Sequence, residues 1–265
     1  GRSRGLGRSR GLGRSRRLAG MDLAEHRDRL IAQTRRAPGV TSLVLFGSAT
    51  AAGAARRDEW SDLDANIFAT SADVERVRRD WPFLPDQERI VLRAREGIDG
   101  GVVLYDDGVV YEFGAGLPWE IRDPHREVVI DGGDLILAGP PPQPNPANEI
   151  RLFLAKLYLG VGRVRRGERL SGGTLIRTYA ASALAHVIRA RLAPTGPDDP
   201  SAFDPLRRLE TAYPQVGGRL AAAVDQPAED AARGLWAVAR DELEPSWRDY
   251  PSKAAQVIAQ RLGWT

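Results

Sequence analysis

The spacing of hydrophobic and polar residues along the chain changes at about residue 138. In the first part, short apolar runs bounded by polar or turn residues predict strands. The longest run, at 100–113, predicts a hairpin that turns at Asp107-Gly108, a dipeptide typical of tight hairpins. The expected strands cover residues 41–48, 62–69, 88–96, 100–113 and 126–131.

Two segments of this first part have apolar residues at helical spacing instead. Residues 21–39 predict a helix that stops at Pro38-Gly39, and residues 71–81 predict a second one with Ser71 as its cap. Strands and helices therefore alternate over residues 21–138, which predicts a mixed-sheet domain.

A proline-rich segment follows, with five prolines between residues 138 and 148. Proline fixes its own backbone and lacks an N–H group, so such a segment suits neither a helix nor a central strand. We expect a linker over 139–148. The remaining chain predicts helices separated by glycine and proline, at 147–167, 171–192, 201–215, 217–226, 228–246 and 252–264.

The fold class expected from these patterns is α+β, with a mixed-sheet domain at 21–138 and an α-helical bundle domain at 149–265. Residues 1–20 stand apart, because they repeat GRSRGL and hold seven arginines without an acid. We expect a disordered extension there. Without those arginines the remaining chain has 31 basic and 35 acidic residues, a net charge of −4. No large basic surface for nucleic acid is therefore expected in the folded part.

Composition excludes several kinds of site. The chain has no cysteine and only three histidines, so disulfides, thiolate catalysis and zinc sites rich in Cys or His are not expected. A metal ion would be held by oxygen atoms, as magnesium is. No apolar stretch reaches the roughly 20 residues of a membrane helix, and the N-terminal segment lacks the apolar core of a secretory signal. We expect a cytoplasmic protein.

The stretch from 43 to 68 holds the most informative polar residues. An apolar strand ends at Gly47-Ser48, where glycine lets the backbone approach a ligand and a following helix would aim N–H groups at a phosphate. On the next strand, Asp62 and Asp64 point to the same side, because side chains alternate along a strand. Two like charges on one face repel each other unless a cation lies between them. The pattern predicts a metal and phosphate site.

A third acid would complete such a site. Glu112 stands inside an otherwise apolar strand, whereas Asp106 and Asp107 fall at the hairpin turn, where aspartate is common. We therefore select Glu112 over the two aspartates.

These motifs resemble the DNA polymerase β-like nucleotidyltransferase superfamily. The domain order, with a helical domain after the strand-containing one, resembles its antibiotic nucleotidyltransferases. The resemblance is carried by LFGS at 45–48, SDLD at 61–64 and Glu112, where the family more often has aspartate. RVRRGE at 163–168 is similar to a phrase in the helical domains of those enzymes. The likeness covers residues 41–114 well and the rest in outline.

The resemblance implies a reaction and a set of roles. Asp62, Asp64 and Glu112 would be catalytic and would hold two Mg²⁺ ions, while Gly47, Ser48 and Lys156 would bind ATP. AMP would be transferred to a hydroxyl of a small molecule, with release of pyrophosphate. An aminoglycoside or lincosamide acceptor would make this an antibiotic-resistance enzyme. The residues leave the general base open among Glu112, Glu149 and Glu168.

Other interpretations remain open at this point. The acceptor hydroxyl could belong to a protein or a tRNA, or the chain could be an antitoxin-like binding module without activity. Arg56 and Arg57 are either a surface pair or triphosphate ligands. Trp60 and Trp119 are expected to serve packing, and His186 is expected to be a satisfied core or surface histidine. Oligomeric state cannot be read from the sequence.

Overall fold

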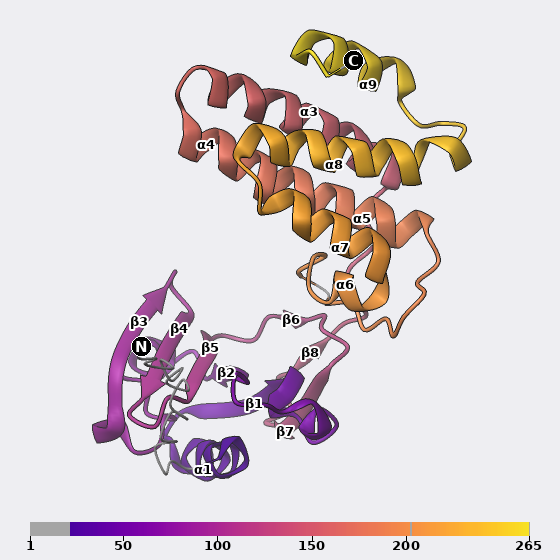
Figure 1. Ribbon diagram of the computed structural model, residues 1–265. Coiled ribbons are helices and arrows are strands. Elements are labelled where there is room, and N and C mark those ends of the chain that lie inside the picture. Colours follow the sequence, from indigo (N-terminus) through magenta and orange to yellow (C-terminus); the bar gives the residue numbers. More distant parts are fainter. Residues whose placement is uncertain (1–21, 202, 265) are drawn as a thin grey trace, which may run out of the picture. The chain divides into compact units, whose positions relative to one another are not determined.

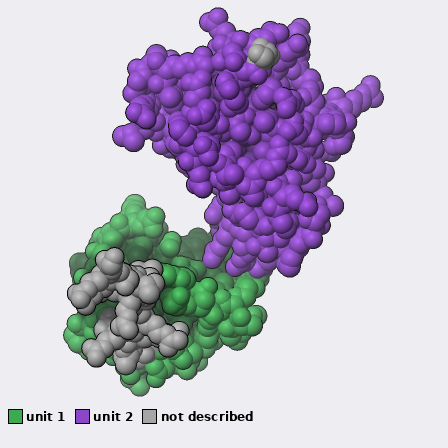
Figure 2. Space-filling model, in the orientation of Figure 1, with its two compact units in different colours: residues 1–139 green, residues 140–265 purple. Residues whose placement is uncertain are grey.

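The computed structural model describes residues 22–201 and 203–264, and the chain divides into two compact units at 1–139 and 140–265 (Figure 2). The first unit contains the strands and the second is helical, so the predicted α+β class with a mixed sheet and a helical part is confirmed. The extension expected at 1–20 lies outside the described residues.

A six-stranded sheet with the order β3-β4-β5-β2-β1-β7 forms the centre of the first unit (Figure 1). The pair β2–β5 is parallel and the other pairs are antiparallel. Its strands are β1 (Val40–Phe46), β2 (Leu63–Ala69), β3 (Ile90–Glu96), β4 (Gly100–Tyr105), β5 (Val110–Gly116) and β7 (Arg126–Ile130). A separate two-stranded parallel sheet is formed by β6 (Glu120–Ile121) and β8 (Ile136–Leu137), and the sequence did not predict it.

Two helices pack against one face of this sheet. The first, α1 (Leu23–Arg36), begins after Asp22, whose side chain accepts a hydrogen bond from the Glu25 N–H. The second, α2 (Val74–Asp80), begins after Asp73 without a side-chain cap, so the prediction of Ser71 as cap is wrong. Buried residues of both helices share one apolar cluster with the inward residues of β1, β2, β4 and β5.

The opposite face of the sheet has a much smaller apolar cluster. Val44, Phe68 and Ile121 are buried there, with Trp119 packed beside them. Along each strand, every second side chain points to this face. Polar side chains can lie here because no large core covers them.

Helices make up the second unit, and their buried residues form a separate core. The helix α3 begins at Pro146 after the cap Asn145, inside the range assigned to the linker. The helices are α3 (Pro146–Arg165), α4 (Arg169–Thr174), α5 (Ala181–Arg191), α6 (Leu209–Ala212), α7 (Pro214–Val224), α8 (Ala228–Glu242) and α9 (Ser252–Leu262). A π-helical segment, Leu175–Ala180, joins α4 to α5.

Two helix predictions in this unit are wrong. Instead of one helix over 201–215, only the four residues of α6 are helical before Pro214. The helix start expected at Gly217 lies inside α7, because proline at the first position starts the helix at Pro214. Position 217 has no room for a larger side chain than glycine, because a Cβ atom would come within 2.6 Å of the Glu210 Cα. Within the described ranges, no helix combines the length and the apolarity that crossing a membrane requires.

Candidate active site: three carboxylates on neighbouring strands

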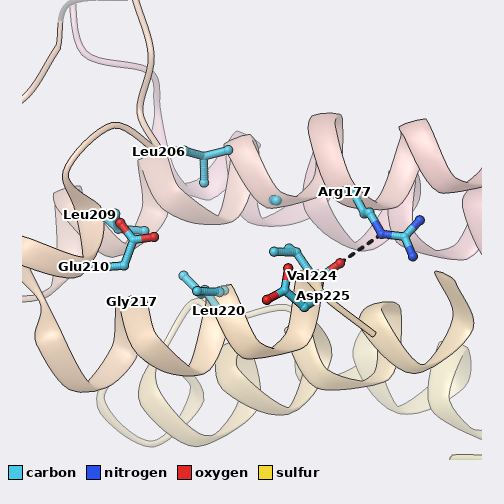
Figure 3. Close-up of a pocket in the computed structure, with 10 residues that line it drawn as sticks. Arg177, Leu206, Leu209, Glu210, Gly217, Leu220, Val224 and Asp225 are labelled. Atoms are coloured by element: carbon cyan, nitrogen blue, oxygen red, sulfur yellow. Dashed lines mark hydrogen bonds between the residues drawn. The ribbon is translucent and has the colours of Figure 1, made fainter. Parts of the chain in front are cut away.

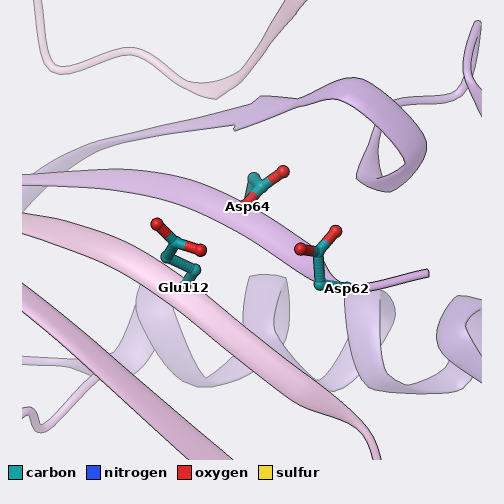
Figure 4. A group of neighbouring side chains, drawn as sticks. All are labelled: Asp62, Asp64 and Glu112. Atoms are coloured by element: carbon teal, nitrogen blue, oxygen red, sulfur yellow. The ribbon is translucent and has the colours of Figure 1, made fainter. Parts of the chain in front are cut away.

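Three carboxylates meet on one face of the sheet, at the start of β2 and on β5 (Figure 4). Asp64 lies directly opposite Glu112 in the parallel pairing of the two strands, and Asp62 precedes β2 by one residue. Each of the three side chains offers an oxygen atom, and these oxygens lie within 4.8 Å of one another. The structure therefore brings together the three acids that the sequence singled out.

Strand alternation explains why these side chains share a face. Leu63 and Ala65 point into the core and are almost fully buried, which turns the residues between and before them to the other side. On β5, Tyr111 and Phe113 are buried in the same way and leave Glu112 exposed. The buried neighbours thus fix the direction of the acids.

The donor set fits a hard divalent cation. All three ligands are carboxylates, the oxygen donors that Mg²⁺ prefers. Asp64 and Glu112 are direct neighbours across two strands, where like charges are unfavourable in the absence of a cation. Asp62, Asp64 and Glu112 could therefore hold magnesium, although their roles as metal ligands and catalytic residues stay predictions.

The segment before Asp62 begins with a short turn and not with the expected α-helix. Residues Gly47–Ala49 form a single 3-10 turn, so the row of open N–H groups that a longer helix would offer is missing. Gly47 has φ +52°, which suits glycine, and a Cβ atom there would lie 3.8 Å from Asp64 Oδ2. The backbone of this turn is therefore close to the carboxylates.

Both groups expected to anchor a phosphate already have protein partners. The Gly47 N–H donates to the His125 carbonyl oxygen at 3.1 Å. The Ser48 hydroxyl donates to the Asp62 carbonyl oxygen at 3.0 Å, which ties the turn to the start of β2. Nucleotide binding by Gly47 and Ser48 stays a prediction, and it would require these donors to exchange partners.

Arg57 holds the same turn from within the loop. Its Nε donates to the Ser48 carbonyl oxygen at 2.8 Å and its Nη2 to the Thr50 carbonyl oxygen at 3.2 Å. Gly53 packs against Gly47 so closely that a Cβ atom would lie 2.0 Å from the Gly47 carbonyl oxygen. These contacts assign Arg57 a structural role that the sequence did not separate from triphosphate binding.

Arg27 and Glu127 connect this loop to distant parts of the chain. Arg27 Nε donates to the Ala49 carbonyl oxygen at 3.0 Å, and its Nη2 donates to Glu127 at 2.7 Å. Glu127 in turn accepts a hydrogen bond from the Ala51 N–H. No local pattern in the sequence marks either residue, because their contacts join positions 22 and 100 apart.

Three other predicted residues lie in the helical unit, on or beside α3. The Lys156 ammonium lies over the ring of Tyr179, 5.9 Å from its centroid. Glu149 is half-buried in the first turn of α3, and Glu168 pairs with Arg166 at 3.1 Å. Nucleotide binding by Lys156 and base catalysis by either glutamate stay predictions.

The structure separates the residues expected to serve packing. Trp119 packs as predicted, because its ring lies edge to face against the ring of Phe68 with 4.6 Å between the ring centroids. Trp60 is 85% exposed, two residues before Asp62, so the prediction that it packs is wrong. His186 is half-buried within α5, and burial lowers its pKa while Glu149 acts in the opposite direction.

Asp107 is more than a turn residue. Its side chain is 4% exposed, and it accepts hydrogen bonds from His26 Nε2 at 3.0 Å and from Arg89 at 2.8 Å. On the other side of the ring, His26 Nδ1 lies 2.9 Å from the Tyr111 hydroxyl, next in sequence to Glu112. The sequence marks only one partner of this contact, because His26 shares the apolar face of α1 with Leu30.

Comparisons with known proteins add little. No family model and no curated protein matches this chain. A solved structure of an aminoglycoside 6-adenyltransferase from Bacillus subtilis is similar over 92% of each chain, with 12% sequence identity and a TM-score of 0.31. At this identity and TM-score the likeness shows no function.

Proposed function

We propose that this chain transfers a nucleoside monophosphate, AMP from ATP, to a hydroxyl group of a small molecule and releases pyrophosphate. The observation that carries the proposal is the convergence of Asp62, Asp64 and Glu112 within 4.8 Å on one face of the sheet. A cluster of oxygen donors on rigid strands is suited to metal-assisted phosphoryl transfer. The resemblance of the LFGS and SDLD motifs to nucleotidyltransferases supports the same reaction.

In this proposal the three acids form the metal platform. Asp62 and Asp64 would hold both ions, and Glu112 would complete the second position. When bound, two Mg²⁺ ions would neutralise charge on the triphosphate and align the acceptor with the α-phosphate. Gly47 would let the triphosphate pass close to Asp64, since no Cβ atom occupies that space. Ser48 and Lys156 would add polar contacts to the phosphates.

The chemical step needs an acceptor for one proton. The acceptor oxygen forms a bond to the α-phosphorus, the bond from that phosphorus to the β-phosphate oxygen breaks, and the electron pair leaves with pyrophosphate. We assign the hydroxyl proton to Glu112, because it is the most exposed of the three carboxylates and lies within the cluster. Glu168 is a weaker candidate, because its carboxylate is paired with Arg166.

The acceptor class rests on the resemblance, which favours an aminoglycoside or a lincosamide. A net charge of −4 over residues 21–265 suits a cationic acceptor. Nucleic acid is the less suitable acceptor, because the folded part lacks an excess of basic residues.

The test is an assay of the full chain with labelled ATP, Mg²⁺ and a panel of aminoglycosides and lincosamides. We expect pyrophosphate release that depends on both one acceptor and the metal. Asp64→Asn should lower kcat by about a thousandfold or more, because it removes one ligand charge without changing side-chain size. Asp230→Asn, which removes an exposed carboxylate of α8, is the matched control and should keep full activity.

Three outcomes would contradict the proposal. Undiminished turnover by Asp64→Asn would remove the metal assignment. Label that appears on protein or tRNA would replace the small-molecule acceptor. A folded wild type that releases no pyrophosphate with any acceptor would favour a binding module instead.

A further inference from the structure

A cavity of about 300 Å³ lies inside the helical unit, far along the chain from the three carboxylates (Figure 3). Its wall comes from the π-helical segment, the start of α5, α6 and α7. The lining is mainly apolar and includes Leu206, Leu209, Leu220, Ala181 and Ala221. This volume is at the lower end of the range for small-molecule sites.

Two carboxylates also line this cavity. Glu210 belongs to α6 and Asp225 follows the last turn of α7, and Figure 3 shows Leu220 between them. Both side chains are exposed, and within residues 22–201 and 203–264 neither has an ion-pair or hydrogen-bond partner. A site with an acid at each side of an apolar floor favours cations with an apolar body.

Arg177 lines the same cavity, but its guanidinium is committed elsewhere. It donates to the carbonyl oxygens of Val224 at 2.9 Å and Gln226 at 2.6 Å, at the C-terminal end of α7. There it satisfies carbonyl groups that the helix end leaves without partners. It therefore leaves the Asp225 carboxylate available to a ligand.

The helix geometry sets the distance between the two acids. Glu210 lies beside Gly217, whose Cβ atom, if present, would come within 2.6 Å of the Glu210 Cα. Asp225 follows Gly217 by eight residues on α7, and a rise of about 1.5 Å per residue places the two acids about 12 Å apart along the helix.

We propose that this cavity binds a linear aliphatic diamine as its dication. One ammonium pairs with Glu210, the other pairs with Asp225, and the methylene chain lies against Leu206, Leu209 and Leu220. The separation of about 12 Å between the two residues along the helix requires a chain of several carbons between the two ammonium groups. An anion would be repelled by both acids, and a polyhydroxylated cation would lose hydrogen bonds to water on the apolar floor.

The π-helical segment Leu175–Ala180 is a second observation at this place. Wider helical turns of this kind are rare and occur frequently at functional sites. Here the segment supplies Arg177 to the cavity wall, and the helix continues as α5 at Ala181, which also lines the cavity. The proposal does not depend on the transfer reaction, because every lining residue belongs to the helical unit.

The experiment is calorimetric titration of the full chain with hexane-1,6-diamine, hexylamine and hexane-1,6-diol at low salt. We expect the diamine to bind with a dissociation constant about fivefold below that of hexylamine, because one exposed ion pair contributes up to about a fivefold change in affinity. The diol should bind more weakly than both amines. Raising the salt concentration should weaken diamine binding.

Variants distinguish this site from general attraction to an acidic surface. Glu210→Gln and Asp225→Asn should each raise the dissociation constant for the diamine about fivefold. Asp249→Asn removes an exposed carboxylate of the same unit outside the cavity and should leave binding unchanged. Circular dichroism checks that each variant is folded. The proposal is overturned if the diamine does not bind, if hexylamine binds equally well, or if Asp249→Asn weakens binding as much as the other two.

Discussion

The buried pair of His26 and Asp107 connects α1 to the turn between β4 and β5. Burial would raise the Asp107 pKa, but hydrogen bonds from His26 and Arg89 outweigh it and hold that pKa below its ordinary value. The unfolded chain therefore binds a proton on Asp107 at a higher pH than the folded chain does. Asp107 contributes stability that is complete above its ordinary pKa of about 4 and is lost as the pH falls through the lower, folded value.

We predict that Asp107→Asn lowers the free energy of unfolding by about 2 kcal/mol at pH 7, because it weakens two hydrogen bonds to a buried group. The difference from wild type should shrink below about pH 4, where wild-type Asp107 also gains a proton. Urea unfolding at both pH values measures this. The control is Asp106→Asn, which removes the half-exposed partner of the same Arg89 and should cost less than about 1 kcal/mol. Equal costs for both variants would show that burial of Asp107 does not matter.

The two tryptophans expected to pack give a second prediction for single residues. Trp60→Ala should change the free energy of unfolding by less than about 0.5 kcal/mol, because its side chain is exposed. Trp119→Ala should cost about 2 kcal/mol, because the ring packs on Phe68 and covers Gly114 and Gly116. Thermal unfolding compares them. A large loss with Trp60→Ala would mean that this ring has a packing partner in the folded chain.

At the scale of elements, strand alternation was readable from the sequence because it depends only on neighbouring residues. Leu63 and Ala65 fixed the phase of β2, and with it the common face of Asp62 and Asp64. The parallel pairing that places Glu112 opposite Asp64 joins segments 48 residues apart, which no local pattern encodes. Glu112 was selected only because it was an acid within an apolar strand. The same limit hid Asp107, whose partners lie in α1 and beside β3.

The loop from Gly47 to Arg57 depends on such distant contacts, and its mobility can be predicted from them. Arg27 bridges the Ala49 carbonyl oxygen and Glu127 with its forked guanidinium, which a lysine ammonium cannot do in the same way. Arg27→Lys should therefore raise hydrogen exchange at the Ala51 amide about tenfold, a loss of about 1.4 kcal/mol in local stability. Mass spectrometry of a peptide that contains Ala51 measures this.

Arg29→Lys is the matched control on the same helix, because its partner Asp86 lies outside the loop. It should leave exchange at Ala51 unchanged. Equal protection in wild type and Arg27→Lys would show that Glu127 holds the Ala51 amide without help from Arg27.

At the scale of the whole molecule, the described residues form separate cores in the two units. Phe153 is fully buried in a cluster drawn entirely from the helical unit, and Phe83 is fully buried in a cluster drawn entirely from the sheet unit. The sequence predicted a boundary between them from five prolines, because proline is incompatible with both regular structures on either side. Units with their own cores can unfold as separate cooperative transitions.

We predict two transitions in scanning calorimetry of the full chain. Phe153→Ala should lower the unfolding free energy of the transition that belongs to the helical unit by about 3–5 kcal/mol, since it leaves a cavity in a closed core. Phe83→Ala should lower the other by a similar amount and leave the first in place. If both substitutions shift one common transition equally, the two cores are thermodynamically coupled and neither unit folds independently of the other.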